Sequence, residues 1–215
     1  MTQIECEAIL FDLDGVLVDS TSCITRHWQK WVHQHGLEMA AVMRVAHGIR
    51  TVETIRLVAP HLDAEKEAER LTAVEVSDTE GVVAIEGALP LLERLPKGVW
   101  AIVTSGSSDL AKARLRRAGL PIPQTLVSAD DVSQGKPAPE PYLVGADRLG
   151  KAAERCVVIE DAPAGIEAAR AAGMRVVGIT MTHSQEELDC ALVVDRLSAL
   201  RILVGDRDRL VIQIE

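Results

Sequence analysis

Two aspartates follow the most apolar segment near the start of the chain, in the stretch ILFDLDGVLVDS. Asp12 and Asp14 are two residues apart, and side chains at that spacing on an extended strand point to one side. Burying such carboxylates is costly unless they bind a cation, share a proton or form an ion pair. Magnesium prefers oxygen ligands of this kind, and a carboxylate can also attack phosphorus. The pair therefore indicates either a solvated strand end or a phosphoryl-transfer site, with Asp12 as nucleophile and Asp14 as acid and base.

Three later segments carry residues that suit a phosphate or a metal ion. Thr104 and Ser105 lie between an expected strand and an expected helix, where hydroxyl and N–H groups either bind a phosphate or cap the helix. Lys136, in the proline-rich stretch SQGKPAPEPY, is either solvated or placed to neutralise phosphoryl charge. Glu160 and Asp161 end another expected strand. That second acidic pair would complete a magnesium site or stabilise the dipole of the next helix.

The elements that must position these residues alternate along most of the chain. Short Val- and Ile-rich runs predict strands at Ala8–Leu13, Val99–Thr104, Thr125–Ser128, Cys156–Ile159, Arg175–Ile179 and Leu192–Val194. Helical patterns between them cover Leu89–Leu95, Asp109–Ala118, Pro139–Leu149, Ala164–Ala172 and Ser184–Asp189. This alternation predicts an α/β fold with a doubly wound parallel sheet, in which ligands bind at the carboxyl ends of the strands.

One segment interrupts the alternation, because residues from about Thr21 to Val82 contain no convincing strand. Helical patterns there cover Thr21–His35, Met39–Ala46, Val52–Val58 and Ala64–Ser77. We therefore expect a Rossmann-like core of residues 1–18 and 83–215, with a small all-helical cap domain at 19–82 inserted after the first strand. The last residues, RLVIQIE, alternate in polarity and are compatible with an edge strand.

Composition narrows the classes of partner. The net charge of −9 argues against nucleic acid or an anionic membrane as a partner. The 4 cysteines lack metal-binding spacing, which favours reduced thiols in the cytosol. The start has no basic region before its short apolar run, and no segment is long enough for a membrane span. These features predict a cytoplasmic protein.

The four chemistry-bearing segments, in this order and each after an expected strand, resemble the four motifs of the haloacid dehalogenase superfamily. The resemblance covers Ala8 to about Leu200, and its most specific parts are DLDGVLVDS and VVIEDAPAGIEAARAAGM. It implies that Asp12 is the nucleophile and Asp14 the acid and base. It further implies a magnesium ion held by the Asp12 carboxylate, the Asp14 backbone carbonyl and Asp161, with Glu160 close by. Thr104, Ser105 and Lys136 would bind the phosphoryl group.

Segments of the cap resemble one group within that superfamily, the polyol- and sugar-phosphate phosphatases such as glycerol-3-phosphate and 2-deoxyglucose-6-phosphate phosphatases. HWQKWVHQHGL and AHGIRTVETIRLVAPHL carry this resemblance. It implies a small phosphorylated sugar or polyol as substrate and a monomeric enzyme. His47 and Arg50 precede a helix and are candidates for substrate contact, although Arg50 can instead pair with Glu53.

Two other functions stay open. A sugar phosphomutase of the β-phosphoglucomutase kind has the same core and cap, but it uses a cap histidine about twelve residues after the nucleophile. Ile24 occupies that position, the nearest histidine is His27, and the cap lysine expected near Val74–Val76 is missing. These departures favour hydrolysis. The other possibility is a binding protein with an inactive site, against which the intact set of Asp12, Asp14, Lys136 and Asp161 argues.

Overall fold

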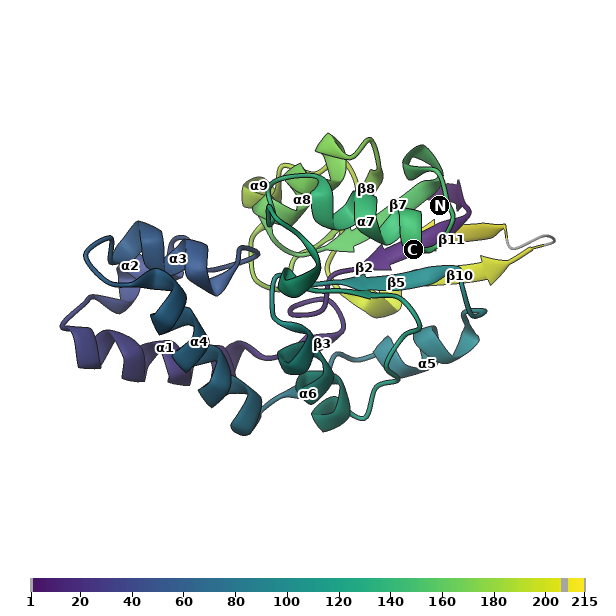
Figure 1. Cartoon of the computed structure of the whole chain (residues 1–215). Coiled ribbons are helices and arrows are strands. Elements are labelled where there is room, and N and C mark those ends of the chain that lie inside the picture. Colours follow the sequence, from purple (N-terminus) through teal and green to yellow (C-terminus); the bar gives the residue numbers. More distant parts are fainter. Residues whose placement is uncertain (1, 206–208, 215) are drawn as a thin grey trace.

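Six strands form a parallel sheet in the order β6-β5-β2-β7-β8-β9 in the computed structural model, which describes residues 2–205 and 209–214 (Figure 1). The strands are β2 (Ala8–Phe11), β5 (Trp100–Val103), β6 (Leu126–Val127), β7 (Cys156–Glu160), β8 (Arg175–Ile179) and β9 (Val193–Val194). β2 lies between β5 and β7, where Ile9 is opposite both Trp100 and Val157. The predicted parallel sheet is therefore confirmed, and its first strand lies inside it.

Helices cover both faces of this sheet, because its strands carry apolar side chains on both faces. Ile9 and Phe11 belong to one core cluster, with α5 (Ala88–Arg94) and α6 (Ser108–Ala118). Ala8 and Leu10 belong to the other, with α7 (Glu140–Arg148) and α8 (Pro163–Ala171). The remaining short helical elements are η1 (Ala129–Asp131), η2 (Ala153–Arg155), α9 (Gln185–Leu188) and η3 (Leu197–Ala199).

A separate helical lobe is formed by α1 (Thr21–His35), α2 (Met39–Met43), α3 (Thr51–Val58) and α4 (Ala64–Ser77), at the left of Figure 1. It has its own apolar core, in which the rings of Trp28 and Trp31 meet edge to face at 5.3 Å. Gly36 ends α1 in a left-handed conformation, and Asp63 caps α4 by accepting a hydrogen bond from the Lys66 N–H. These signals explain why α1 and α4 have the predicted bounds.

The chain enters and leaves the helical lobe through two paired segments. β3 (Val18–Asp19) and β4 (Val83–Ala84) are antiparallel neighbours, with Val18 opposite Ala84 and Asp19 opposite Val83. The pair lies at the place where the sequence predicts the boundary between residues 19–82 and the rest of the chain. That this lobe acts as a separate cap domain over a substrate stays a prediction.

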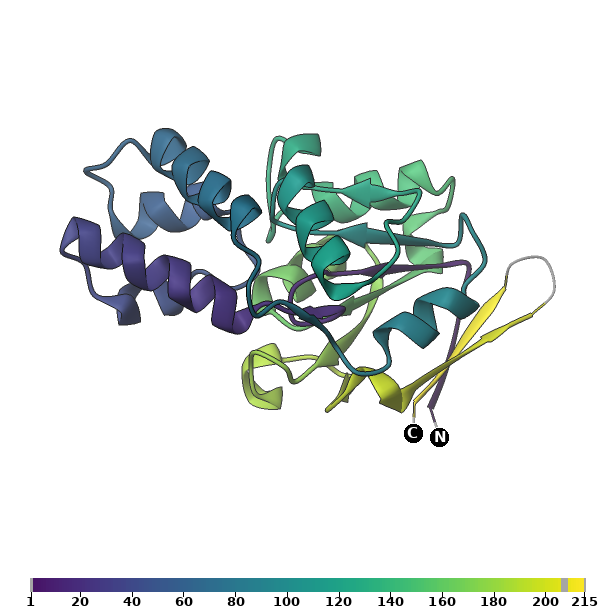
Figure 2. The ribbon, with the colours of Figure 1, turned by 90° about the horizontal axis from the view of Figure 1, so that it is seen from below.

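A second sheet differs from the expectation for the end of the chain. β1 (Thr2–Cys6), β11 (Leu210–Ile214) and β10 (Leu200–Val204) form three antiparallel strands in the order β1-β11-β10. The terminal strand β11 is thus the central strand of this sheet and not an edge strand. Its alternation places Leu210 and Ile212 in the main core, because one face of the sheet packs against it. Figure 2 shows this sheet on the side of the molecule away from the helical lobe.

Candidate active site

Asp12 lies directly after β2, beside the buried ammonium group of Lys136. Lys136 Nζ donates to Asp12 Oδ1 at 2.5 Å, to Glu160 Oε1 at 2.6 Å and to the Val103 carbonyl at 3.2 Å. The lysine is only 1% exposed, so its charge is balanced by the two carboxylates and not by water. The loop between η1 and α7 thereby brings Lys136 to the sheet edge where β2, β5 and β7 end.

The Glu160 carboxylate is surrounded by donors. Its Oε1 accepts from Lys136 and from the Tyr142 hydroxyl at 3.0 Å, and its Oε2 accepts from the backbone N–H groups of Asp161 and Ala162 at 2.8 and 2.9 Å. A methyl group on Gly165 would lie 1.6 Å from Oε1, so the third residue of α8 must be a glycine. Glu160 therefore orients Lys136 and the turn into α8.

Asp161 completes an acidic cluster at this edge. One oxygen each of Asp12, Glu160 and Asp161 lies within 4.8 Å of the others. Asp161 Oδ2 accepts from the Thr182 hydroxyl at 2.6 Å, and a Cβ on Gly15 would lie 1.9 Å from the same oxygen. Gly15 has a φ of +83°, so only glycine allows the loop after Asp14 to approach Asp161 this closely.

Burial and mutual repulsion disfavour the charged forms of these acids. Burial raises the pKa of Asp12, Lys136 lowers it and the charges of Glu160 and Asp14 raise it, with a net pKa of about 7. Burial, Glu160 and Asp12 likewise raise the pKa of Asp161 well above its usual range. Among the described residues, Asp12 Oδ2 and Asp161 Oδ1 accept no hydrogen bond. Two crowded carboxylates with free oxygens suit a divalent cation with oxygen ligands.

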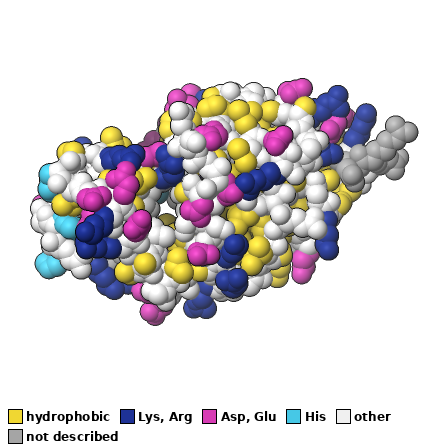
Figure 3. Space-filling model, in the orientation of Figure 1, with side chains coloured by type: hydrophobic (Ala, Val, Ile, Leu, Met, Phe, Trp, Pro, Cys, Tyr) yellow, Lys and Arg dark blue, Asp and Glu magenta, His cyan; other side chains and the backbone are white. Residues whose placement is uncertain are grey.

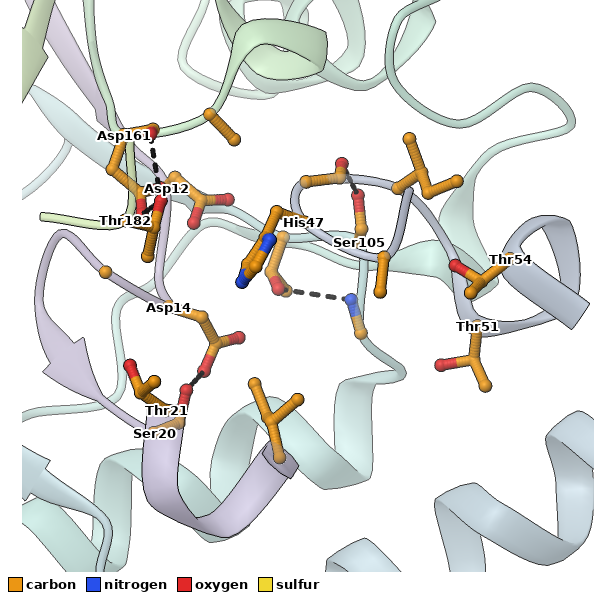
Figure 4. Close-up of a pocket in the computed structure, with 18 of the residues that line it drawn as sticks. Asp12, Asp14, Ser20, Thr21, His47, Thr51, Thr54, Ser105, Asp161 and Thr182 are labelled. Atoms are coloured by element: carbon orange, nitrogen blue, oxygen red, sulfur yellow. Dashed lines mark hydrogen bonds between the residues drawn. The ribbon is translucent and has the colours of Figure 1, made fainter. Parts of the chain in front are cut away.

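Asp14 faces the same pocket but has different partners. Its Oδ1 accepts from the Ser20 hydroxyl at 2.6 Å, and its Oδ2 accepts from Arg114 Nη1 at 2.7 Å. Ser20 precedes α1 and Arg114 lies on α6, so both lobes reach this carboxylate. Figure 4 shows Asp14 and Ser20 near the start of α1, with Asp12, Asp161 and Thr182 grouped beside them.

Thr104 and Ser105 follow β5 and line the pocket, as does the loop after α2. Ser105 Oγ donates to the Gly48 carbonyl at 2.7 Å, which joins the core to the helical lobe. Thr104 Oγ1 accepts from the Gly106 N–H at 3.2 Å. The two hydroxyls therefore line the same pocket as Asp12, and in this arrangement Ser105 is bound to the loop after α2.

His47 and Arg50 occupy different places. His47 points into the pocket, and its ring lies 5.2 Å from that of His183 (Figure 4). Burial and His183 lower the pKa of His47, which favours its neutral form. Arg50 is not among the pocket-lining residues; its Nη2 pairs with Glu53 Oε1 at 2.5 Å, and its Nη1 donates to the Ser133 carbonyl at 3.2 Å. The structure thus has the Arg50–Glu53 pair that the sequence analysis left open.

The pocket also contains residues that the sequence analysis did not select. Four of them line it directly: Thr182, Ser20, Glu75 and Arg114. A fifth, Tyr142, donates a hydrogen bond from its hydroxyl group to Glu160. Thr182 follows β8, so its hydroxyl could have been predicted from its place just after the carboxyl end of a strand. Glu75 and Arg114 are 39 residues apart on two helices, and no local pattern indicates that they meet.

The sequence profile of the haloacid dehalogenase-like hydrolases matches residues 6–173. The chain belongs to this family. Hexitol phosphatase A of Escherichia coli is 44% identical over 87% of the chain and 90% of that protein. Glycerol-1-phosphate phosphohydrolase 2 of Saccharomyces cerevisiae is 35% identical over 93% of the chain and 86% of that protein. These similarities confirm the family and the group of relatives that the motifs predicted.

Among solved structures, a hydrolase from Pseudomonas syringae superposes with a TM-score of 0.78 at 29% identity, over 90% of this chain and 94% of that one. A hydrolase of known structure therefore shares this fold over most of the chain. No helix in residues 2–205 and 209–214 has the length and apolar character needed to cross a membrane.

Proposed function

We propose that this haloacid dehalogenase-like hydrolase is a magnesium-dependent phosphatase that hydrolyses a small sugar or polyol phosphate through an aspartyl-phosphate. The observation that carries the proposal is the Asp12 carboxylate at the base of a pocket, 2.5 Å from the buried Lys136 ammonium. Asp12 is thereby next to a positive charge that can also hold a phosphoryl oxygen. The names of the relatives, a hexitol phosphatase and a glycerol-1-phosphate phosphohydrolase, support the substrate class.

In this mechanism an Asp12 oxygen attacks phosphorus and the bond from phosphorus to the ester oxygen breaks. Asp14 gives its proton to the leaving oxygen, then takes a proton from the water that hydrolyses the aspartyl-phosphate. Lys136 and the Thr104 and Ser105 hydroxyls bind the phosphoryl oxygens. Ser105 would have to release the Gly48 carbonyl or share its hydroxyl to do so.

The donor set fits magnesium, because free carboxylate oxygens of Asp12 and Asp161 share one buried edge. The Asp14 backbone carbonyl would be a further ligand, and Glu160 would stay close by while orienting Lys136. When bound, the ion would neutralise charge on the carboxylates and on the phosphoryl group. The pKa values of Asp12 and Asp161, raised in its absence, are consistent with a site built for a cation.

We further propose that residues 19–82 act as a cap over the substrate. Both lobes line the pocket, and the Ser105–Gly48 and Arg50–Ser133 hydrogen bonds connect them. His47 would then contact the substrate directly, while Arg50 would hold the cap in place. A closed cap excludes bulk water while the phosphoryl group is transferred.

The same proposal extends to the cellular compartment, the oligomeric state and the macromolecular partners of the protein. The protein would act as a cytosolic monomer without a nucleic-acid or membrane partner. Support comes from the net charge of −9, from four reduced cysteines and from the interspersed acidic and basic side chains on the face shown in Figure 3. A broad cationic surface would be expected for a nucleic-acid or anionic-membrane partner.

The mutase alternative has less support at the same pocket. Ile24, at the position where a mutase has its cap histidine, lines the pocket. His27 is buried elsewhere, with Nε2 3.0 Å from Asp78 Oδ2. A general base for a sugar hydroxyl is therefore missing from that position.

Phosphate release, measured with and without magnesium, tests the proposal. The esters would be the phosphates of glycerol, sorbitol, glucose, 2-deoxyglucose, fructose, ribose and glycolate, together with β-glucose-1-phosphate. We expect magnesium-dependent release, fastest from one polyol or hexose phosphate. Conversion of β-glucose-1-phosphate to another sugar phosphate, without release from any ester, would instead establish a mutase.

A further inference from the structure

Arg114 connects the proposed acid and base with the helical lobe. Its Nη1 donates to Asp14 Oδ2 at 2.7 Å, and its Nη2 donates to Glu75 Oε1 at 3.2 Å. Arg114 lies on α6 of the core and Glu75 on α4 of the cap. A continuous chain of charged groups therefore runs from Asp14 to the cap wall of the pocket.

Both members of this ion pair are buried yet incompletely bonded. Arg114 is 5% exposed and Glu75 4%, and both line the pocket. Within the described residues, Arg114 Nε is a buried donor without a partner, and no donor reaches Glu75 Oε2. Arg114 Nε is closed off from the pocket, so the open group of the pair is Glu75 Oε2, to which a ligand hydroxyl would donate a charge-assisted hydrogen bond.

The rest of the cap wall has matching chemistry. Thr21, Thr25, Thr51 and Thr54 line it together with Ile24, Trp28 and Met43. Glu75 is the only Asp, Glu, Lys or Arg that the described part of the cap contributes to the lining. A second anionic group on a substrate would therefore meet a carboxylate and hydroxyls, without a cation from the cap.

We propose that Glu75 and Arg114 form a specificity site that binds hydroxyl groups close to the leaving oxygen and rejects substrates with a second negative charge. The inference rests on the proposed phosphatase function and names the groups of the substrate that the cap would recognise. Arg114 contacts Asp14, so the recognised hydroxyl lies within reach of the bond that breaks. The substrate is then a phosphate ester of a neutral polyhydroxylated carbon chain.

The test compares Glu75→Gln with Glu69→Gln, an exposed glutamate on the same helix. Three magnesium-loaded reactions are followed: glycerol 1-phosphate, n-propyl phosphate, which lacks its hydroxyls, and phosphoglycolate, which adds a carboxylate. We expect Glu75→Gln to lower the kcat/KM ratio of glycerol 1-phosphate to n-propyl phosphate about tenfold, because charge-assisted hydrogen bonds are lost. The ratio of phosphoglycolate to n-propyl phosphate should rise, and Glu69→Gln should change neither ratio.

A role of Glu75 in holding Asp14 alone would slow all three esters alike, so unchanged ratios would overturn the inference while the phosphatase function stands. A wild-type enzyme that releases no phosphate from any ester would overturn the proposed function itself. Glu75→Asp provides a second variant in case Glu75→Gln does not fold. It keeps the charge but retracts the carboxylate by one methylene, so it should lose the preference for hydroxyls and keep the rejection of phosphoglycolate.

Discussion

At the scale of residues, Lys136 holds the site together because three acceptors surround its ammonium group. Asp12 and Glu160 repel each other, and the shared cation balances the charge of both carboxylates. The arrangement leaves Asp12 next to a positive charge and facing the pocket. Its proposed function as nucleophile and the geometry around Glu160 can be tested separately.

Replacing Asp12 with asparagine removes the proposed nucleophile while an oxygen remains to accept the hydrogen bond from Lys136. We expect Asp12→Asn to reduce phosphate release to background with little change in the melting temperature. Phosphate release and thermal unfolding monitored by circular dichroism provide the two measurements. Near wild-type turnover would show that the nucleophile is assigned to the wrong residue.

Gly165→Ala tests the position of Glu160. The new methyl group would lie 1.6 Å from Glu160 Oε1, so the carboxylate must move and Lys136 with it. Since small displacements of catalytic groups cost about a hundredfold in rate, we expect a fall in kcat of about that size. Ala171→Ser, at an exposed position of the same helix, serves as the control and should retain normal kcat. Equal kcat values for the two variants would contradict this function of Glu160.

The strand-end residues could be predicted because each follows an apolar run and carries a chemically distinctive side chain. Asp12 and Asp161 were found in this way and Lys136 from its place in a proline-rich loop, and the structure brings all three to one edge. The ion pair between Arg114 and Glu75 could not be predicted from the sequence, because it depends on how α4 packs against α6. For Arg50 the sequence allowed two partners, and the structure has the Glu53 pair.

At the scale of elements, the end of α4 is fixed to α1 at the crossing between the lobes. Asp78 pairs with Arg26 Nη2 and His27 Nε2, each at 3.0 Å, and its carbonyl accepts from the Cys23 thiol. Helix periodicity predicted both helices, but this contact between residues about 50 apart needed the folded structure. These contacts hold the start of α1 and the end of α4 together, next to the β3–β4 pair.

The Asp78 contacts should make stability depend on pH. Hydrogen bonds from His27, from the Glu80 backbone and from Arg26 hold the pKa of Asp78 well below its usual range. A carboxyl with a lowered pKa in the folded state stabilises the fold at pH values above its unfolded pKa of about 3.9. This stabilisation is lost progressively as the pH falls from there towards the lower pKa of the folded state. The melting temperature of Asp78→Asn should therefore lie below that of the wild type at pH 7, and the difference should begin to narrow as the pH falls below about 4.

Thermal unfolding from pH 3 to pH 7 would measure this difference. Asp195→Asn is the control, because Asp195 is exposed and pairs only with its exposed neighbour Arg196. A gap for Asp78→Asn that stays constant over the whole range would contradict the assignment.

At the scale of the whole molecule, the small antiparallel sheet extends the core away from the pocket. Alternation in RLVIQIE predicted a strand, but its central place could not be predicted because β1 and β10 were not recognised as its partners. Leu210 is fully buried against the core, whereas Leu203 on the neighbouring strand is 38% exposed. The last strand is thus part of the folding unit.

Leu210→Ala should therefore lower the free energy of unfolding by about 2–5 kcal/mol, the usual cost of a cavity in a core. Leu203→Ala removes the same atoms at an exposed place and should cost no more than about 1 kcal/mol. Urea unfolding of both variants would give the comparison. Equal effects would mean that β11 contributes little to the core.

The distribution of tryptophans has a practical consequence. Two of the 3 in the chain, Trp28 and Trp31, lie in the helical lobe, and Trp28 also lines the pocket. Trp100 is in the sheet, with its ring 6.4 Å from that of Phe11. In a Trp100→Phe variant, excited at a wavelength that only tryptophan absorbs, the fluorescence would come from the helical lobe alone. Its emission spectrum could then follow the arrival of a ligand and the movement of that lobe in real time, without an attached dye.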